Sequence, residues 1–150
     1  MGGYPCGVNT VTGKCSKFSK EWFVQLDKQR EIDEPWMDRE FNWIRKKIHG
    51  KRVLEIGYGM GRNHVKLAES SGELFGIDIT PRNKGITQKH LESYGMKSNL
   101  QIGDAEKLPF PKAYFDFVYS FGVLHHTPDM KKAINEVYRV LKPGGMAWIV

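Results

Sequence analysis

Glycines and acidic residues near the middle of the chain have the types and spacing of a nucleoside-binding site. Gly57, Gly59 and Gly61 alternate in the stretch GYGMG, directly after the apolar run VLEI. Glycine lets the backbone turn sharply and lets a ligand approach the chain closely. Asp78 ends a second apolar run, where a carboxylate can accept hydrogen bonds from both ribose hydroxyls. These residues predict a ligand that contains a ribose.

The spacing of the glycines bears on the rest of that ligand. The dinucleotide fingerprint is G-x-G-x-x-G, whose third glycine allows close helix packing around a pyrophosphate. Arg62 stands at that position here, and the pattern is G-x-G-x-G. The mismatch disfavours a nicotinamide dinucleotide. A tight strand-to-helix turn that binds no ligand stays open as an alternative.

A parallel sheet would bring these residues together. Five apolar runs predict strands at 52–56, 73–77, 99–102, 115–120 and 146–150, and the segments between them are mainly helical. Pro81, after the capping residue Thr80, opens one of these helices, which ends at Gly95. Right-handed crossovers favour an α/β fold with a doubly wound parallel sheet in the order 3-2-1-4-5.

The last predicted helix begins after Asp129 and is broken by the PGG at 143–145. Its apolar residues are expected on its buried side; they are Ala133, Ile134, Val137, Tyr138 and Leu141.

Residues 1–50 predict a leader and a helical cap in front of a domain at 51–150. The leader, to about residue 18, has little periodicity, and two amphipathic helices follow it. Their apolar stripes are expected to pack against the sheet. The stripes consist of Trp22, Phe23 and Leu26, then Trp36, Met37, Phe41, Ile44 and Ile48.

Composition excludes several classes of protein. The chain has no apolar run of roughly 20 residues and no signal peptide, so we expect a cytoplasmic protein without a membrane span. Cys6 and Cys15 lack neighbours at metal-ligand spacing and are expected to be reduced thiols. The net charge of +6 is densest at 45–52, where cations suit the last turn of a helix, so nucleic-acid binding is not expected.

The stretch LEIGYGMG resembles the first motif of the class I S-adenosylmethionine-dependent methyltransferases. The resemblance continues through FGIDIT, GDAEKLPFP, FDFVYSFGVLHHTPD and EVYRVLKPGG, and covers roughly residues 51–150. It is closest in style to the small-molecule, methyltransferase type 11-like group that includes quinone-pathway enzymes. The resemblance implies a Rossmann-like fold, S-adenosyl-L-methionine as cofactor, and methyl transfer to an unidentified small-molecule acceptor.

Each part of that cofactor needs a different partner. Backbone amides from Gly57 to Gly61 can approach its carboxylate, and Glu55 can attract its ammonium directly or through water. Asp78 can hold the ribose, and Ile79 is expected to pack on one face of the adenine.

The resemblance assigns further residues after the third and fourth strands. Asp104 matches the acid that binds the adenine amine, and Ala105 supplies a backbone amide to the ring; a solvated loop acid is the alternative for Asp104. Ser120 and Phe121 match the point where that family lines the methyl pocket.

Two histidines, His125 and His126, follow these residues. Either histidine could act as a general base, although helix packing or a cofactor contact is the commoner role. Two adjacent histidines are expected to point apart on a helix, and no third ligand is evident, so no metal site is expected. No catalytic residue is assigned from the sequence.

The chain stops at Val150, inside its last apolar run. The resembled family continues with a helix and an antiparallel pair of strands that carry much of its substrate pocket. We therefore expect a partial chain whose last strand leaves an apolar edge, which a homodimer could cover.

Three functions fit the sequence. The first is a methyltransferase, and the second is a non-catalytic domain that binds the same cofactor and regulates a partner. The third is a nicotinamide oxidoreductase, which Arg62 and Asp104 disfavour.

Overall fold

Five parallel strands form the centre of the molecule. The structure is a computed structural model that describes residues 15–150; most of the expected leader, with Cys6, lies outside these residues, and Cys15 is a free thiol. The strand order is β3-β2-β1-β4-β5 and every pair is parallel, which confirms the predicted topology. The strands are β1 (Arg52–Ile56), β2 (Glu73–Asp78), β3 (Asn99–Ile102), β4 (Phe115–Ser120) and β5 (Leu141–Ile149).

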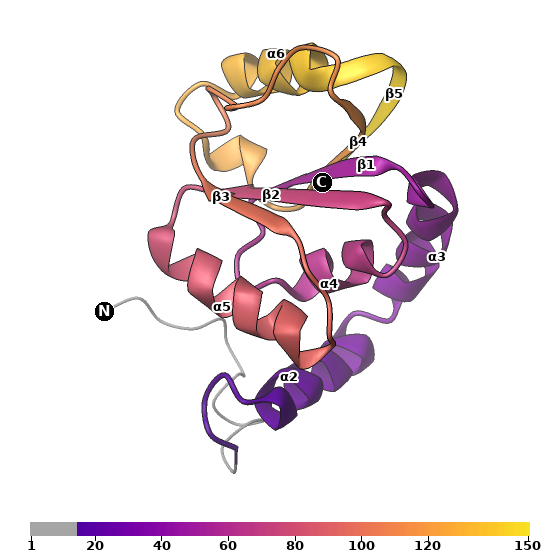
Figure 1. Cartoon of the computed structure of the whole chain (residues 1–150), viewed down its shortest axis with the longest axis vertical. Coiled ribbons are helices and arrows are strands. Elements are labelled where there is room, and N and C mark those ends of the chain that lie inside the picture. The colour runs from indigo at the N-terminus through magenta and orange to yellow at the C-terminus, as the bar shows by residue number, and fades with distance from the viewer. Residues whose placement is uncertain (1–14) are drawn as a thin grey trace.

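Helices cover both faces of this sheet. Helices α3, α4 and α5 lie on one side, and α6 lies on the other (Figure 1). The helices are α2 (Lys20–Asp33), α3 (Trp36–Ile48), α4 (Arg62–Ala68), α5 (Pro81–Ser93) and α6 (Met130–Val140), with a short 3₁₀ helix, η1 (Leu124–His126). None of the helices within residues 15–150 has the length and apolar character needed to cross a bilayer.

Alternate side chains of β1 build a core on each face. Val53 packs with Phe41 and Ile44 of α3, as the apolar stripe of that helix predicts. Leu54 packs on the other face in a cluster that includes Val137 of α6. Because both faces are covered, the inner strands β1, β2 and β4 bury nearly continuous runs, whereas the edge strands β3 and β5 do not.

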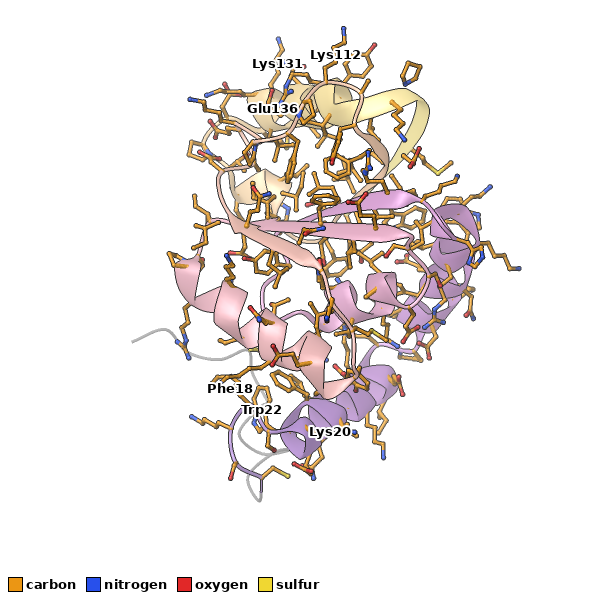
Figure 2. All side chains as sticks on the ribbon, viewed as in Figure 1. Phe18, Lys20, Trp22, Lys112, Lys131 and Glu136 are labelled. Carbon is orange, nitrogen blue, oxygen red and sulfur yellow. The ribbon has the colours of Figure 1, made fainter. Side chains whose placement is uncertain are left out.

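Helix α2 packs against α5, so the prediction that its stripe meets the sheet is wrong. Trp22 and Phe23 cluster with Ile86 of α5, and Phe18 lies beside Trp22 with their ring centroids 5.2 Å apart (Figure 2). The Phe23 ring also stacks on His90 at 4.2 Å. Helices α3, α4 and α5 already occupy this face of the sheet, so α2 forms a further layer outside α5 (Figure 1).

Helix α6 buries a narrower stripe than predicted. Ala133, Val137 and Val140 are buried, with spacings of four and three residues. Ile134 and Tyr138 are 40% and 82% exposed, because they lie on the adjacent stripe of the helix.

Strand β5 begins earlier than the sequence predicted. Leu141 already pairs with Phe115 of β4, so α6 ends at Val140, ahead of the PGG segment at 143–145. The register then shifts, and Met146 pairs with Phe117. Gly144, with a φ of 77°, lies in this irregular part of the strand, which explains how a strand can contain glycine and proline.

Gly76 gives a stability test of the packing beneath β2. A Cβ atom there would lie 2.7 Å from Tyr58 Cδ1 and 2.8 Å from His64 Cε1. We expect Gly76→Ala to lower the free energy of unfolding by about 1–3 kcal/mol, because the two rings have to shift. The midpoint and slope of urea unfolding measure this change.

Gly85 provides the matched control, because a Cβ atom on this exposed position of α5 has no neighbour within 4 Å. Gly85→Ala should raise the free energy of unfolding by about 0.4–1 kcal/mol. Equal effects of the two substitutions would contradict this account of the packing.

Candidate functional site

Two adjoining cavities open at the carboxyl ends of the strands, where ligands bind in doubly wound sheets. The first, called here the strand-end pocket, has a volume of about 400 Å³ and follows β2 and β3. The second, called here the helix-lined pocket, has a volume of about 540 Å³ and lies between the glycine loop and α2. Gly57, Gly59, Thr80 and Asn83 line both, so the two cavities are neighbours around one loop.

The three glycines of this loop serve different purposes. All three have φ between 54° and 84°, a backbone region that disfavours other residues. A Cβ atom on Gly57 would lie 2.3 Å from Val123, and one on Gly61 would lie 2.9 Å from Thr87. A Cβ atom on Gly59 would meet nothing within 4 Å. Gly59 therefore leaves open space beside the chain, while Gly57 and Gly61 allow close packing within the protein. The N–H groups of all three glycines donate to acceptors inside the protein, so the expectation that they are available to the cofactor carboxylate is not met in this structure.

Asp78 connects the glycine loop to the start of α5. Its carboxylate is 7% exposed and accepts hydrogen bonds from the backbone amides of Gly59 and Thr80, both at 2.8 Å. The side-chain amide of Asn83 donates a third bond at 3.1 Å. A carboxylate has about four lone-pair positions, so Asp78 has capacity for a further donor in the strand-end pocket, which it lines.

Three other predicted residues share the strand-end pocket with Asp78. Ile79 is 71% exposed and presents an apolar side chain to this cavity. Asp104 is exposed, and its Oδ1 accepts the Glu106 backbone N–H at 2.8 Å, which fixes the loop after β3. Ala105 is buried in the same wall. The structure therefore brings together four residues that the sequence placed after two different strands.

Glu55 lines the helix-lined pocket from beneath, and His64 of α4 is its partner. The Glu55 carboxyl is 1% exposed, and its Oε2 lies 2.7 Å from His64 Nδ1. Burial raises the pKa of Glu55, and the hydrogen bond and charge of His64 oppose this rise. No role for His64 was predicted from the sequence. The one available signal was that His64 lies in the first turn of α4, directly before the apolar residue Val65.

Three arginines, Arg30, Arg62 and Arg82, also line the helix-lined pocket, and none of them was assigned a role in binding from the sequence. Arg30 reaches in from α2 and is 8% exposed, with its Nε bonded to Glu34 at 2.6 Å. The pKa of Arg62 is lowered by burial and by the nearby charge of Arg30. Among residues 15–150, Arg62 Nε and Asn63 Oδ1 find no hydrogen-bond partner although both atoms are buried. The buried Arg30 and the unpaired Nε–H of Arg62 suit an anionic group, whereas the Asn63 oxygen can only accept a donor such as an ammonium N–H.

The segment after β4 divides between the protein interior and the pockets. Ser120 is fully buried, and its hydroxyl donates to the Ile56 carbonyl at 3.2 Å, so it holds β4 against β1. Phe121 lines the helix-lined pocket and stacks on Trp36, with ring centroids 6.1 Å apart.

The histidine pair follows in η1. His126 lines the strand-end pocket, and the rings of His125 and His126 lie 3.9 Å apart. The expectation that these rings point apart is wrong, because the segment forms a tighter 3₁₀ turn. The part of the chain from residue 15 onward holds no group of three or more potential metal ligands.

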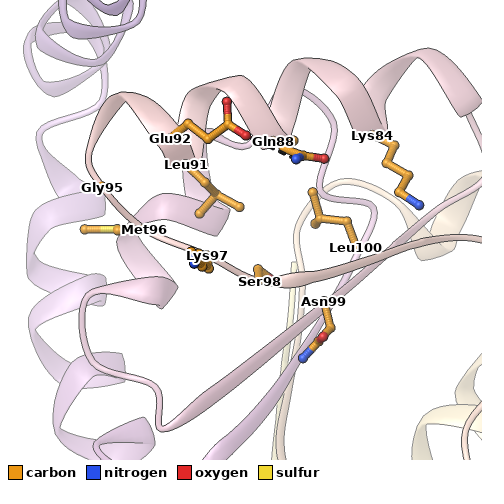
Figure 3. Close-up of a pocket in the computed structure, with 10 residues that line it drawn as sticks. All are labelled: Lys84, Gln88, Leu91, Glu92, Gly95, Met96, Lys97, Ser98, Asn99 and Leu100. Atoms are coloured by element: carbon orange, nitrogen blue, oxygen red, sulfur yellow. Dashed lines mark hydrogen bonds between the residues drawn. The ribbon is translucent and has the colours of Figure 1, made fainter.

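A third cavity of about 550 Å³ is a groove between α5 and the loop before β3 (Figure 3). Its walls include Leu91, Met96, Ser98 and Leu100. It contains none of the site residues predicted from the sequence, so the candidate site comprises the two joined pockets.

Comparison with known proteins gives a family for this geometry. A profile of the methyltransferase domain matches residues 54–149, which is more than half of the chain. The chain is 35% identical over 100 residues to an uncharacterized methyltransferase, YcgJ, of Bacillus subtilis. It is 39% identical over 100 residues to the ubiquinone/menaquinone biosynthesis C-methyltransferase UbiE of Neisseria meningitidis. These matches cover 66% and 64% of this chain, and the chain spans 40% of the length of each relative.

Solved structures agree with these sequence matches. The crystal structure of Bacillus subtilis YcgJ superposes with a TM-score of 0.69 at 30% identity, covering 75% of this chain and 50% of that one. A putative S-adenosyl-L-methionine-dependent methyltransferase from Methanococcus maripaludis superposes with a TM-score of 0.71 at 25% identity, covering 91% of this chain and 65% of that one. The chain therefore belongs to the family of S-adenosylmethionine-dependent methyltransferases, as its motifs predicted.

Proposed function

We propose that the protein transfers a methyl group from S-adenosylmethionine to a small-molecule acceptor. In this proposal residues 51–150 bind the cofactor, and the helices before residue 50 cap it. The observation that carries the proposal is the pair of pockets joined at Gly59, because one is lined by acids and an exposed apolar side chain and the other by arginines and a buried acid. The cofactor has the same two-part chemistry, an adenosine and a charged amino-acid tail.

The strand-end pocket suits the adenosine. The carboxylate of Asp78 would accept a ribose hydroxyl at the position that its three protein donors leave, and the second hydroxyl if the Asn83 amide gives up its place. Asp104 would accept the adenine amine, the backbone amide of Ala105 would donate to the ring, and Ile79 would cover one face of it. Ser120 would act indirectly, by holding the end of β4 beside this pocket.

The helix-lined pocket suits the amino-acid tail. The carboxylate of the tail would pair with Arg62 and Arg30, and it would give the unpaired Nε–H of Arg62 an acceptor. Its ammonium would pair with Glu55. A pyrophosphate fits this pocket poorly, because it has no cationic group for the buried Glu55 carboxyl to bind.

Positioning supplies much of the rate in such a reaction. The bound cofactor would supply an activated methyl group on a sulfonium. The protein has to hold the acceptor in line and exclude water, which can contribute about 7–11 kcal/mol to lowering the barrier. Phe121, which lines the helix-lined pocket and stacks on Trp36, would pack on an acceptor.

The proposed acceptor is a small molecule, and similar proteins are named for chemically different ones. The names of similar proteins include a sterol 4-C-methyltransferase of Caenorhabditis elegans and a quinone-biosynthesis methyltransferase of Neisseria meningitidis. Such different acceptors on one cofactor-binding domain indicate that specificity depends on other parts of those proteins.

Asp78→Ala tests the ribose assignment. Loss of the charge-assisted bonds should weaken S-adenosylmethionine binding by about 2 kcal/mol, a factor of about 30 in Kd, measured by titration calorimetry. A nicotinamide dinucleotide should give no binding heat with either protein. Asp104→Asn is the matched control for folding, since an asparagine oxygen can still accept the Glu106 N–H. Unchanged affinity in Asp78→Ala would contradict the assignment.

Arg62→Gln tests the placement of the carboxylate. This variant should bind S-adenosylmethionine about tenfold more weakly, because a charge-assisted bond is lost. It should bind 5′-methylthioadenosine, which lacks the amino-acid tail, as well as the unchanged protein does. Equal losses for both ligands would show that Arg62 acts only through the fold.

Methyl transfer itself is tested with cofactor that carries a radiolabelled methyl group. Incubation with a small-molecule extract should move the label into an extractable product, and Asp78→Ala should slow this transfer in proportion to its weaker binding. Cofactor binding without any labelled product would favour a non-catalytic regulator.

A further inference from the structure

His64 holds the buried carboxyl of Glu55 from below and is itself fixed from its other side. Its Nε2 lies 2.7 Å from the hydroxyl oxygen of Ser98, and that hydroxyl donates to the Leu74 carbonyl at 2.9 Å. Ser98 lies in the wall of the groove drawn in Figure 3. The chain of contacts therefore runs from Glu55 in the helix-lined pocket, through the fully buried imidazole of His64, to Ser98 in the groove beside α5.

The hydrogen bonds determine how many protons the pair holds. A serine hydroxyl has one proton, and Ser98 donates it to a carbonyl, which can only accept. His64 Nε2 must therefore carry a proton and donate it to Ser98. The bond between His64 Nδ1 and Glu55 Oε2 then contains one proton, which belongs either to the carboxyl or to the imidazole.

The surroundings of Glu55 set which of the two sites holds this proton. Arg30 of α2 favours the carboxylate, whereas Asp78 of β2 favours the protonated acid, as burial does. Tyr119 of β4 is adjacent to Glu55 in the sheet, and the ring of Tyr58 lies 5.8 Å from that of His64; burial raises the pKa of both phenols, so both are neutral. A cation arriving beside Glu55 adds to the effect of Arg30 and moves the balance toward the carboxylate.

We propose that Glu55 and His64 share a single proton, held by Glu55 in the free protein and passed to His64 Nδ1 when the ammonium of S-adenosylmethionine binds. The O–H bond of Glu55 breaks, an N–H bond forms on His64, and no proton enters or leaves the protein. This inference rests on the proposed function, since it assigns the ammonium to Glu55. His64 is then a positioning residue that lets a buried acid become an anion only when its cation is present.

Nitrogen-15 NMR of the histidines tests this transfer in the unchanged protein. In the free protein His64 should be neutral with its proton on Nε2, and saturation with S-adenosylmethionine should convert it to the doubly protonated form. The exposed His49 serves as a reference that should not change. A neutral ring with its proton on Nδ1, a doubly protonated ring before cofactor is added, or no change on saturation would each overturn the proposal.

Titration calorimetry of His64→Gln provides a second test. Without the imidazole, Glu55 has to release its proton to solvent on binding, so about one proton per cofactor should appear when buffers of different ionisation enthalpy are compared. The affinity of this variant should rise with pH up to about pH 7, where the ammonium keeps its proton. The unchanged protein should release no proton from this pair, and its affinity should depend less on pH.

Ser98→Ala is the matched control, because it keeps the bond between Glu55 and His64 and should leave the proton count near zero. A proton count in His64→Gln equal to that of the unchanged protein would overturn the proposal. Binding of S-adenosylmethionine without a change at His64 would overturn this inference alone. Absence of binding by the unchanged protein would overturn the proposed function as well.

Discussion

The carboxylate of Asp78 is the one contact on which the geometry of the site depends. It ends β2, and its two oxygens hold the amide of Gly59 on one side and the amide of Thr80 on the other. The glycine loop and the first turn of α5 are thereby fixed relative to each other. Because Gly59, Thr80 and Asn83 all line both cavities, this carboxylate also fixes the boundary between them. A buried charge of this kind is stable because several donors satisfy it.

The two pockets differ in electrostatic character, and that difference matches the two halves of the cofactor. Acidic groups and an exposed isoleucine line the strand-end pocket, where neutral hydroxyl and amine donors would bind. The helix-lined pocket sets Arg30 and Arg62 against Glu55, as a zwitterionic tail requires. Helix α2 supplies Arg30, so the N-terminal helices contribute to the site as well as to packing.

Much of the fold could be predicted from the sequence, because the inner strands β1, β2 and β4 are mainly apolar runs bounded by turn and helix signals. The strand order followed from the handedness of crossovers. Asp78 was identified by its position at the end of an apolar run, whereas Asp104 and Ala105 came from the resemblance to the family. Periodicity alone could not separate adjacent stripes of α6, so Ile134 and Tyr138 were placed on the wrong side. It also could not show that β5 tolerates the PGG segment through a shift in register.

The polar partners inside the site were beyond such reasoning. His64 and Ser98 are 34 residues apart, and their contact depends on how α4 packs beside β2 and β3. No role for Arg30 was predicted, since nothing in the sequence shows that α2 packs on α5 and reaches the glycine loop. These contacts come from tertiary packing, which local patterns do not encode.

A crystal structure of the protein with S-adenosylmethionine tests the central claim most directly. We expect the ribose hydroxyls on Asp78, the adenine beside Asp104 and Ala105, and the amino-acid tail between Glu55 and Arg62. Cofactor bound in the groove between α5 and β3, or bound in the two pockets with these carboxylates turned away from it, would contradict the account.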